Sequence, residues 1–182
     1  EPVTTGTIAR GSYAVENVYS ASLPGHYVTG NLYRPTTSIG PLPVVMLPYG
    51  HWPGGRWIWR SDADCQREID FGAERTTNGA RAPLQAACAT LAQMGCVVFH
   101  YDMVGYCDSD TLPHASGFDD AAAVLNCQSL LGLGAWNSLR ALDYVWSLDG
   151  IDRSRIAITG ASGGATQSIA LAGPDEPLLA AF

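Results

Sequence analysis

The sequence predicts an α/β fold, in which a mostly parallel sheet carries helices on both faces and follows an N-terminal antiparallel hairpin. Three short apolar runs, at residues 43–48, 96–101 and 155–159, are typical of strands that are covered on both faces. Helical segments alternate with these runs, and such an alternation favours parallel pairing. The chain has 182 residues, of which 47% are hydrophobic and 15% charged. We therefore expect a single, sizeable core over residues 1–182, in one domain.

The N-terminal part of the chain predicts the hairpin and the first buried strand. Residues 13–34 alternate in the manner of strands around Pro24-Gly25, a dipeptide typical of turns. Residues 43–48, PVVMLP, form an unbroken apolar run. This run leads into the loop YGHWPGGRWIWR, which is rich in glycine and tryptophan.

The rest of the chain predicts helices that alternate with two further buried strands. Residues 83–94 have helical spacing, with a proline near the start and Gly95 just past the end. A strand at 96–101 and an irregular segment follow, and then a helical stretch over 118–148 in which GLG, Gly132 to Gly134, marks the candidate break. The remaining expected elements are a strand at 155–159, a helix at 164–171 and the first residues of another strand at 178–182.

Charge and composition exclude several classes of partner. The net charge of −7 and the pI near 4.8 argue against nucleic acid, whose binding proteins are basic. No apolar run approaches the ~20 residues that span a bilayer, so we expect no membrane partner. The chain begins Glu1-Pro2-Val3, which suits a processed secreted or periplasmic protein and equally a cut cytoplasmic one.

The five cysteines form no CxxC pair, so we expect neither a zinc site nor a thioredoxin-type motif. Cys88 and Cys96 lie in apolar surroundings and are expected in the core. The sequence leaves open whether Cys65, Cys107 and Cys127 form a disulfide. We expect no bound metal and no cofactor.

The stretch RIAITGASGGATQ, which begins at Arg155, supports two interpretations. One is a dinucleotide-binding turn, but that pattern requires a glycine at Thr166 and a place in the first βαβ unit. The other is a nucleophile elbow, G-x-S-x-G, with Ser162 on a tight turn between a strand and a helix. The position after three strands favours the elbow. The simpler alternative is that Ser162 only caps the following helix.

A second segment fits the same chemistry. Acyl transfer needs hydrogen-bond donors aimed at the developing oxyanion, and one donor comes from a loop after an earlier central strand. Gly50 frees the backbone of such a loop, so we expect the N–H groups of His51 and Gly163 to form an oxyanion hole. The alternative for His51 is an ordinary histidine of a surface loop.

Other polar and aromatic side chains have more than one interpretation. Trp52 and Trp57, beside the expected oxyanion hole, are candidates for a substrate-stacking surface, although the loop could equally fold over its own aromatic rings. Asp102 is expected to brace its loop through backbone N–H groups rather than to act as the catalytic acid. Asp108, Asp110 and His114 lack the spacing of a metal site and are expected in a solvated loop.

Several segments together resemble α/β-hydrolases of the acetyl-xylan-esterase-like and dienelactone-hydrolase-related group. They are LPYGHWPGGR, MGCVVFHYDMVGYCDSD, PHASGF, WNSLRALDYVWSLDGID and RIAITGASGGATQ. The resemblance implies a serine esterase with Ser162 as its nucleophile. It also implies the order nucleophile, acid, histidine, with both partners on later loops.

The histidines of this chain depart from that order. All four, His26, His51, His100 and His114, precede Ser162, and the acidic residues after it are Asp175 and Glu176. We expect His100 to pack or hydrogen-bond inside its strand, and only His114 could reach the site by an unusual route. The sequence therefore predicts that the chain is the N-terminal portion of a hydrolase, whose acid and histidine lie on a continuation or on a second chain.

The function that these patterns predict is hydrolysis of a carboxylic ester of modest size, with acetyl groups on a carbohydrate as the candidate substrate. A non-catalytic binding or scaffold subunit of the same fold is the alternative that the absent base and acid suggest. The same chemistry on peptides or lactones stays open, since substrate choice lies in loops that the elbow does not determine.

Overall fold

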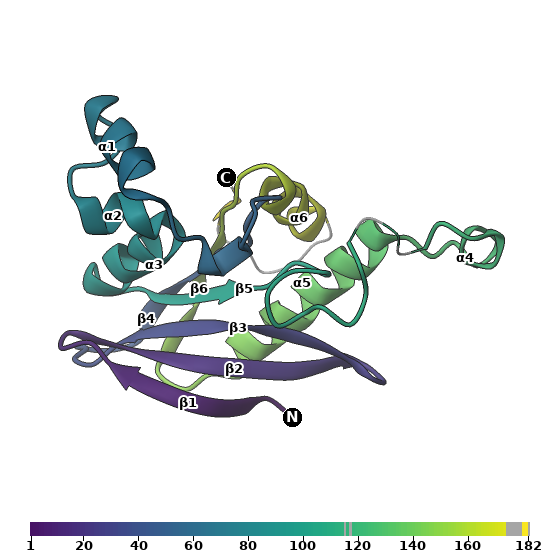
Figure 1. Cartoon of the computed structure of the whole chain (residues 1–182). Coiled ribbons are helices and arrows are strands. Elements are labelled where there is room, and N and C mark those ends of the chain that lie inside the picture. Colours follow the sequence, from purple (N-terminus) through teal and green to yellow (C-terminus); the bar gives the residue numbers. More distant parts are fainter. Residues whose placement is uncertain (115, 117, 174–179, 182) are drawn as a thin grey trace.

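Figure 1 shows the computed structural model of the chain, which describes residues 1–114, 116, 118–173, 180 and 181. Within this described part the strands form a seven-stranded sheet in the order β1-β2-β3-β5-β4-β6-β7. The strands are β1 (Val3–Ala9), β2 (Tyr13–Leu23), β3 (His26–Pro35), β4 (Leu42–Met46), β5 (Val97–Tyr101), β6 (Ile151–Ile158) and β7 (Ala180–Ala181).

The sheet is antiparallel at one side and parallel at the other. Strands β1, β2, β3 and β5 pair antiparallel, and the expected hairpin is confirmed, with Leu23 facing His26 across the turn. Strands β5, β4, β6 and β7 pair parallel, so that Val44 lies between Val97 and Ile156. The predicted mixed sheet with a leading antiparallel hairpin is therefore confirmed.

The helices cover both faces of this sheet, as the sequence predicts. Alternate residues of β5 point to opposite sides: Phe99 packs in a cluster with Val145 of α5, whereas Val98 packs with Cys88 of α3. The helical elements are the short 3₁₀ turn η1 (Gly55–Trp57) and the α-helices α1 (Asp62–Asp70), α2 (Thr77–Arg81), α3 (Pro83–Gln93), α4 (Ala121–Leu125), α5 (Leu130–Trp146) and α6 (Gly163–Ala172).

One expected helix is divided, and at a different place from the expected one. The stretch 118–148 consists of α4 and α5, and the glycines at 132–134 continue α5 rather than break it. The new helix begins where Ser129 serves as N-cap, because its Oγ accepts a hydrogen bond from the Gly132 N–H at 3.0 Å. The serine that caps α5, rather than the glycines within it, therefore determines where the second helix begins.

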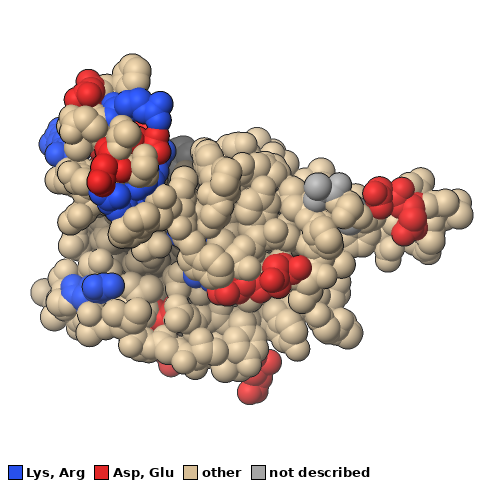
Figure 2. All heavy atoms as spheres, in the orientation of Figure 1, with Lys and Arg blue, Asp and Glu red and all other residues tan. Residues whose placement is uncertain are grey.

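Charged side chains are unevenly distributed over the molecule. Figure 2 shows acidic and basic residues gathered at the end formed by α1 and α2, with a largely uncharged surface over much of the same view. Ion pairs link these elements, among them Arg60 with Glu68 at 3.1 Å and Arg81 with Asp62. Among the described helices, the longest has 17 residues, and none combines the length and apolar character needed to cross a bilayer.

Candidate active site

Ser162 occupies a strained turn between the end of β6 and the start of α6. Its backbone has φ 57° and ψ −120°, in a region that residues other than glycine rarely adopt. Such a conformation costs about 1–3 kcal/mol and persists only when the surroundings hold it. The side chain is exposed, and among the described residues its Oγ has no hydrogen-bond partner. The serine is therefore presented to solvent rather than used to cap α6.

Two glycines of the elbow are required by space. A Cβ on Gly160 would lie 2.6 Å from the carbonyl carbon of Gly164 and 2.7 Å from the Pro48 carbonyl oxygen. A Cβ on Gly164 would also meet the Pro48 oxygen. The turn after β6 therefore packs directly on the backbone that follows β4. This contact holds Ser162 in a defined position at the carboxyl end of the sheet.

The loop after β4 reaches the elbow at Gly50. A Cβ on this residue would lie 2.7 Å from the Cβ of Ser162 and 2.8 Å from the Ala161 carbonyl oxygen. The next residue, His51, places its ring against Gly163, where an added Cβ would be 2.6 Å from His51 Cε1 and 2.9 Å from Nδ1. The structure thus brings together the four residues that the sequence associates with nucleophile and oxyanion hole.

His114 also lies in this site, beside His51. The two Nε2 atoms are 2.7 Å apart, and Nδ1 of His114 lies 2.7 Å from the carbonyl oxygen of Val104. Because a carbonyl can only accept, Nδ1 of His114 carries the proton, and in the neutral pair its Nε2 accepts from Nε2–H of His51. Nδ1 of His51, next to Gly163, then keeps its lone pair.

Sequence reasoning expected His114 in a solvated loop, from which it could reach the site only by an unusual route, and it did not predict the pairing with His51. The local signal was the turn at Gly105, which has φ 83° and whose added Cβ would collide with the backbone of His114. A glycine in that conformation brings the segment around His114 back onto the end of β5. The sequence alone does not say which side chain this return delivers, so the contact with His51 was not foreseeable.

The tryptophans of the loop after β4 are divided between two places. Trp52 lies at the elbow, with its ring 3.1 Å from the position of a Cβ on Gly50. Trp57 is half exposed, stacks with Arg56 at 5.1 Å, and lines a broad groove of about 1130 Å³ between the hairpin and α3. Trp59 is exposed and stacks on Arg81. Of the two candidate stacking residues, only Trp52 adjoins Ser162.

The Asp102 carboxylate holds its loop in place, as expected, but it binds side chains rather than backbone N–H groups. This buried carboxylate accepts hydrogen bonds from Thr29 Oγ1 at 2.7 Å, Tyr49 Oη at 2.9 Å and Arg56 Nε at 2.8 Å. The expected contacts with backbone N–H groups are therefore wrong. A buried carboxylate requires a positive charge nearby, and the buried guanidinium of Arg56 supplies it.

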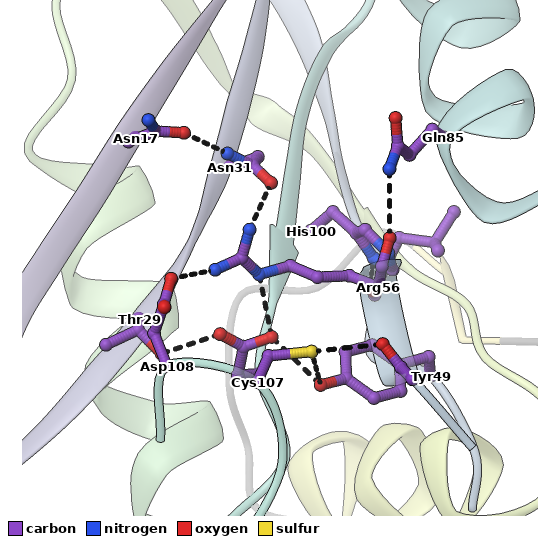
Figure 3. A network of polar contacts seen from close by, with 12 residues as sticks. Asn17, Thr29, Asn31, Tyr49, Arg56, Gln85, His100, Cys107 and Asp108 are labelled. Carbon is purple, nitrogen blue, oxygen red and sulfur yellow. Dashed lines mark hydrogen bonds and ion pairs between the residues drawn. The ribbon is translucent and has the colours of Figure 1, made fainter. Parts of the chain in front are cut away.

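Figure 3 shows how Arg56 joins several elements in one network. Its guanidinium also donates to Asn31 Oδ1 of β3 at 2.6 Å and pairs with Asp108 of the loop after β5. Tyr49 Oη lies 3.4 Å from the sulfur of Cys107 in the same loop. The loop that carries Gly50 and His51 is thereby fastened to the hairpin and to the end of β5.

Burial shifts the pKa values of groups in this network and in strand β5. Burial raises the pKa of Asp102, while the charge and hydrogen bond of Arg56 act in the opposite direction. Burial also raises the pKa of Tyr49, which stays a hydrogen-bond donor. In β5, burial lowers the pKa of His100 to about 4, and its Nδ1 contacts the Leu47 carbonyl oxygen at 2.6 Å. The expectation that His100 hydrogen-bonds locally is confirmed.

The remaining predicted residues lie away from the elbow. His26 is buried in the hairpin, where its Nε2 contacts Asn137 Nδ2 at 2.9 Å. The cysteines of the described part are free thiols, with Cys88 fully buried. Among residues 1–114, 116, 118–173 and 180–181, no three His, Cys, Asp or Glu side chains gather as metal ligands. Asp175, Glu176 and most of the expected strand at 178–182 lie outside the described residues.

Comparison with known proteins gives matches to solved structures. No protein-family model matches the sequence, and no curated protein is similar enough to count as a match. The whole chain superposes on Methylesterase BT1017 with 29% sequence identity and a TM-score of 0.71. An acetyl xylan esterase from Paenibacillus sp. R4 also matches the whole chain, with 18% identity and a TM-score of 0.70. A dienelactone hydrolase-like promiscuous phosphotriesterase, P91, matches 94% of the chain, with 18% identity and a TM-score of 0.59.

The chain has the α/β-hydrolase fold. The resemblance to acetyl-xylan-esterase-like and dienelactone-hydrolase-related proteins that its motifs indicate is confirmed by these matches. The chain spans only part of each similar structure, covering 34%, 52% and 58% of their respective lengths. Within the α/β-hydrolase fold, the elbow at Ser162 and the loop at Gly50 lie at the carboxyl ends of β6 and β4, the edge at which open α/β sheets bind ligands.

Proposed function

We propose that this chain is the nucleophile-bearing part of a serine esterase that hydrolyses carboxylic esters through an acyl-enzyme, and that residues 1–182 form the N-terminal portion of one hydrolase domain. The observation that carries the proposal is the conformation of Ser162, with φ 57° at a strand-to-helix turn and its Cβ directly against Gly50. Strain of this kind at an exposed serine between a strand and a helix is typical of a nucleophile elbow.

In the proposed reaction, Ser162 Oγ attacks the ester carbonyl carbon. The carbonyl oxygen becomes an oxyanion, which the N–H groups of Gly163 and His51 stabilise. The bond between the carbonyl carbon and the alkoxy oxygen then breaks, the base returns the serine proton to this oxygen, and the alcohol leaves. Water next attacks the acyl-enzyme and gives a proton to the same base, which passes it to Ser162 Oγ as the acid is released. The base that takes the serine proton, and the acid that orients this base, are assigned to the rest of the hydrolase domain, since the chain spans only 34–58% of the matched structures.

The proposed substrate is an acylated carbohydrate. Support for the carbohydrate comes from the name of one similar protein, an acetyl xylan esterase, while the name of another, a methylesterase, supports ester hydrolysis in general. An acylated polysaccharide lies outside the cell, so this substrate goes together with a secreted or periplasmic location.

The test is made on the full-length protein with Ser162→Ala. We expect kcat on a small acetyl ester to fall at least 10³-fold, with unchanged thermal unfolding, because the residual oxyanion hole gives little turnover without a nucleophile. Ser147→Ala, at the end of α5, serves as the matched control and keeps wild-type turnover.

Labelling with a fluorophosphonate gives a readout independent of substrate choice. The wild-type protein should be labelled at Ser162 and the alanine variant should not, because only an activated serine reacts. A protein that binds acylated carbohydrate but takes up no label would contradict the proposal and favour a binding subunit.

A further inference from the structure

A small apolar pocket lies beside Gly163, on the side of the elbow that faces α5. Its volume is about 160 Å³. The residues that line it come from the loops after β4 and β5, from α5 and from α6, and they are His51, Met103, Val104, His114, Leu130, Leu131, Gly134, Gly163, Thr166 and Gln167. Gly163, whose N–H is proposed to hold the oxyanion, therefore forms part of the pocket wall.

The chemistry of the wall favours an apolar occupant. No Asp, Glu, Lys or Arg is among the lining residues, and much of the wall is aliphatic or thioether side chain. The two histidines are hydrogen-bonded to each other at 2.7 Å, so one polar atom of each ring is already satisfied within the wall. The buried Nε2 of Gln167 has no hydrogen-bond partner among the described residues, so the wall offers one free donor, but the rest of it would leave the hydroxyls of a sugar or a carboxylate without partners.

The size of the pocket exceeds what an acetyl methyl group needs. An apolar protein cavity of about 150 Å³ holds a benzene molecule. A pocket of about 160 Å³ is thus large enough for a phenyl ring or a chain of about four to six carbons. A single methyl group would leave most of this volume filled by water against apolar walls.

Gly134 keeps this volume open. It lies on α5, it is buried, and a Cβ built on it meets no atom within 4 Å. Its φ is not positive, so the helix does not require glycine at this position. Glycine in a helix costs about 1 kcal/mol relative to alanine. The space in front of Gly134 is therefore the feature of the pocket that an added side chain would remove.

We propose that this pocket receives an apolar substituent of the ester, of the size of a phenyl ring or a short alkyl chain, and that the esterase prefers such esters to acetates of small alcohols. The inference rests on the proposed function, because the pocket is assigned through its contact with the oxyanion amide of Gly163. The substituent can belong to the acyl group or to the alcohol, and the chemistry of the pocket is the same for both.

The experiment measures kcat/KM of the full-length protein in two series. In the acyl series, p-nitrophenyl acetate, butyrate and benzoate are compared; in the alcohol series, methyl, butyl and benzyl acetates. Burial of each methylene favours binding by about fourfold, so we expect roughly a 15-fold preference for butyrate over acetate, which differ by two methylenes, or roughly a 60-fold preference for butyl over methyl, which differ by three. The series that shows the preference identifies the source of the substituent. Acetate and methyl ester as the best substrates of both series would overturn the proposal.

Gly134→Leu then tests the pocket itself. We expect the ratio of kcat/KM for the bulky ester to that for the small ester to fall at least tenfold, because the new side chain occupies the space of the substituent. Gly134→Ala should give a smaller fall, and Gly132→Ala, at an exposed position of the same helix, should leave the ratio unchanged. An unchanged ratio in a folded Gly134→Leu protein would exclude the pocket as the subsite.

A binding measurement separates failure of this inference from failure of the proposed function. In Ser162→Ala, NMR should detect benzyl alcohol bound to the protein, with binding lost in Ser162→Ala/Gly134→Leu. If Ser162→Ala retained full turnover, the nucleophile assignment would fail while this binding still tested the pocket. If Ser162→Ala were inactive and benzyl alcohol did not bind, the subsite alone would be wrong.

Discussion

At the scale of single residues, the site contains glycines that leave room for neighbouring backbone and one serine whose own backbone conformation is strained. Gly50, Gly160 and Gly164 have φ values outside the left-handed region, so any residue could adopt their backbone conformation. They are glycines because other backbones lie where a Cβ would be. Ser162, in contrast, has a Cβ and a positive φ. The unfavourable conformation therefore falls on the residue proposed to perform the chemistry, which agrees with strain stored at functional sites.

Gly50→Ala should separate catalysis from folding. The new methyl group would lie 2.7 Å from the Cβ of Ser162, so the loop that carries the His51 N–H must move away from the elbow. Loss of one oxyanion donor lowers kcat by about 10²–10³-fold, and we expect an effect of this size with a smaller change in KM. Steady-state kinetics of the full-length protein measure it.

Gly6→Ala, in β1, is the matched control for this substitution. Its Cβ would meet only Asn17 Nδ2, at 3.8 Å, which is an ordinary contact. We expect wild-type kinetics from it. Wild-type kcat in Gly50→Ala would mean that the loop after β4 contributes no oxyanion donor.

At the scale of elements, the buried pair of Arg56 and Asp102 holds the loop after β4 against β3 and β5. Both side chains are nearly inaccessible to solvent, so each charge depends on the other. Removal of one partner from such a pair typically costs about 3–5 kcal/mol, much of it the cost of the charge left behind. The pair therefore contributes more to the position of the loop after β4 than to the net free energy of unfolding.

A double-mutant cycle on this pair tests that role. We expect Arg56→Met to lower the free energy of unfolding by about 3–5 kcal/mol. Arg56→Met with Asp102→Asn should be less destabilised than the sum of the single variants, because the carboxylate of Asp108, which also loses Arg56, is exposed and no buried carboxylate remains uncompensated. Urea denaturation gives the four free energies. Strict additivity would show that the two charges do not depend on each other.

The elements that could be predicted from sequence are those with a strong apolar pattern. Strands β4, β5 and β6 were recognisable because both of their faces are covered, and the hairpin because of its turn. Strand β1 was missed because its side chains are largely exposed, and α1 because it is strongly polar and Cys65 is its only buried residue. The division of the 118–148 stretch depended on the cap at Ser129, whose signal was overlooked beside the glycines.

The candidate site was predictable only where it is local in sequence. The elbow around Ser162 and the flexible loop at Gly50 are short motifs with a known geometry. The contacts of His51 with His114, and of Arg56 with Asp102, join residues 63 and 46 positions apart, and no pattern in the chain encodes such pairings. For the same reason the prediction that Asp102 stabilises its loop was correct, whereas its predicted partners were wrong.

At the scale of the whole molecule, two buried histidines couple stability to pH. Burial lowers the pKa of His100 to about 4 and also lowers the pKa of His26. Below an unfolded pKa of about 6.5, the unfolded chain binds protons that the folded protein does not. Their contribution to stability is therefore complete above about pH 6.5 and decreases as the pH falls toward 4.

His100→Gln should reduce this dependence on pH. For the wild-type protein, the depressed pKa of His100 predicts a loss of about 2 kcal/mol in the free energy of unfolding between pH 7 and pH 5. In the variant that loss should be smaller by this amount, although its stability at pH 7 is also lower. Urea denaturation at the two pH values provides the comparison. An equal loss in both proteins would mean that His100 is protonated in the folded state.

The order of strands in the sheet has a consequence for the growing chain. Strand β4 lies between β5 and β6, so Val44 finds its two neighbours only when Val97 and Ile156 have been synthesised. At about 5–20 residues per second, the second edge of β4 waits roughly 6–20 s on the ribosome. During that interval an apolar strand with an unpaired edge is open to other chains. The same central position that later aligns the serine with its oxyanion loop therefore exposes this strand to wrong pairing during synthesis.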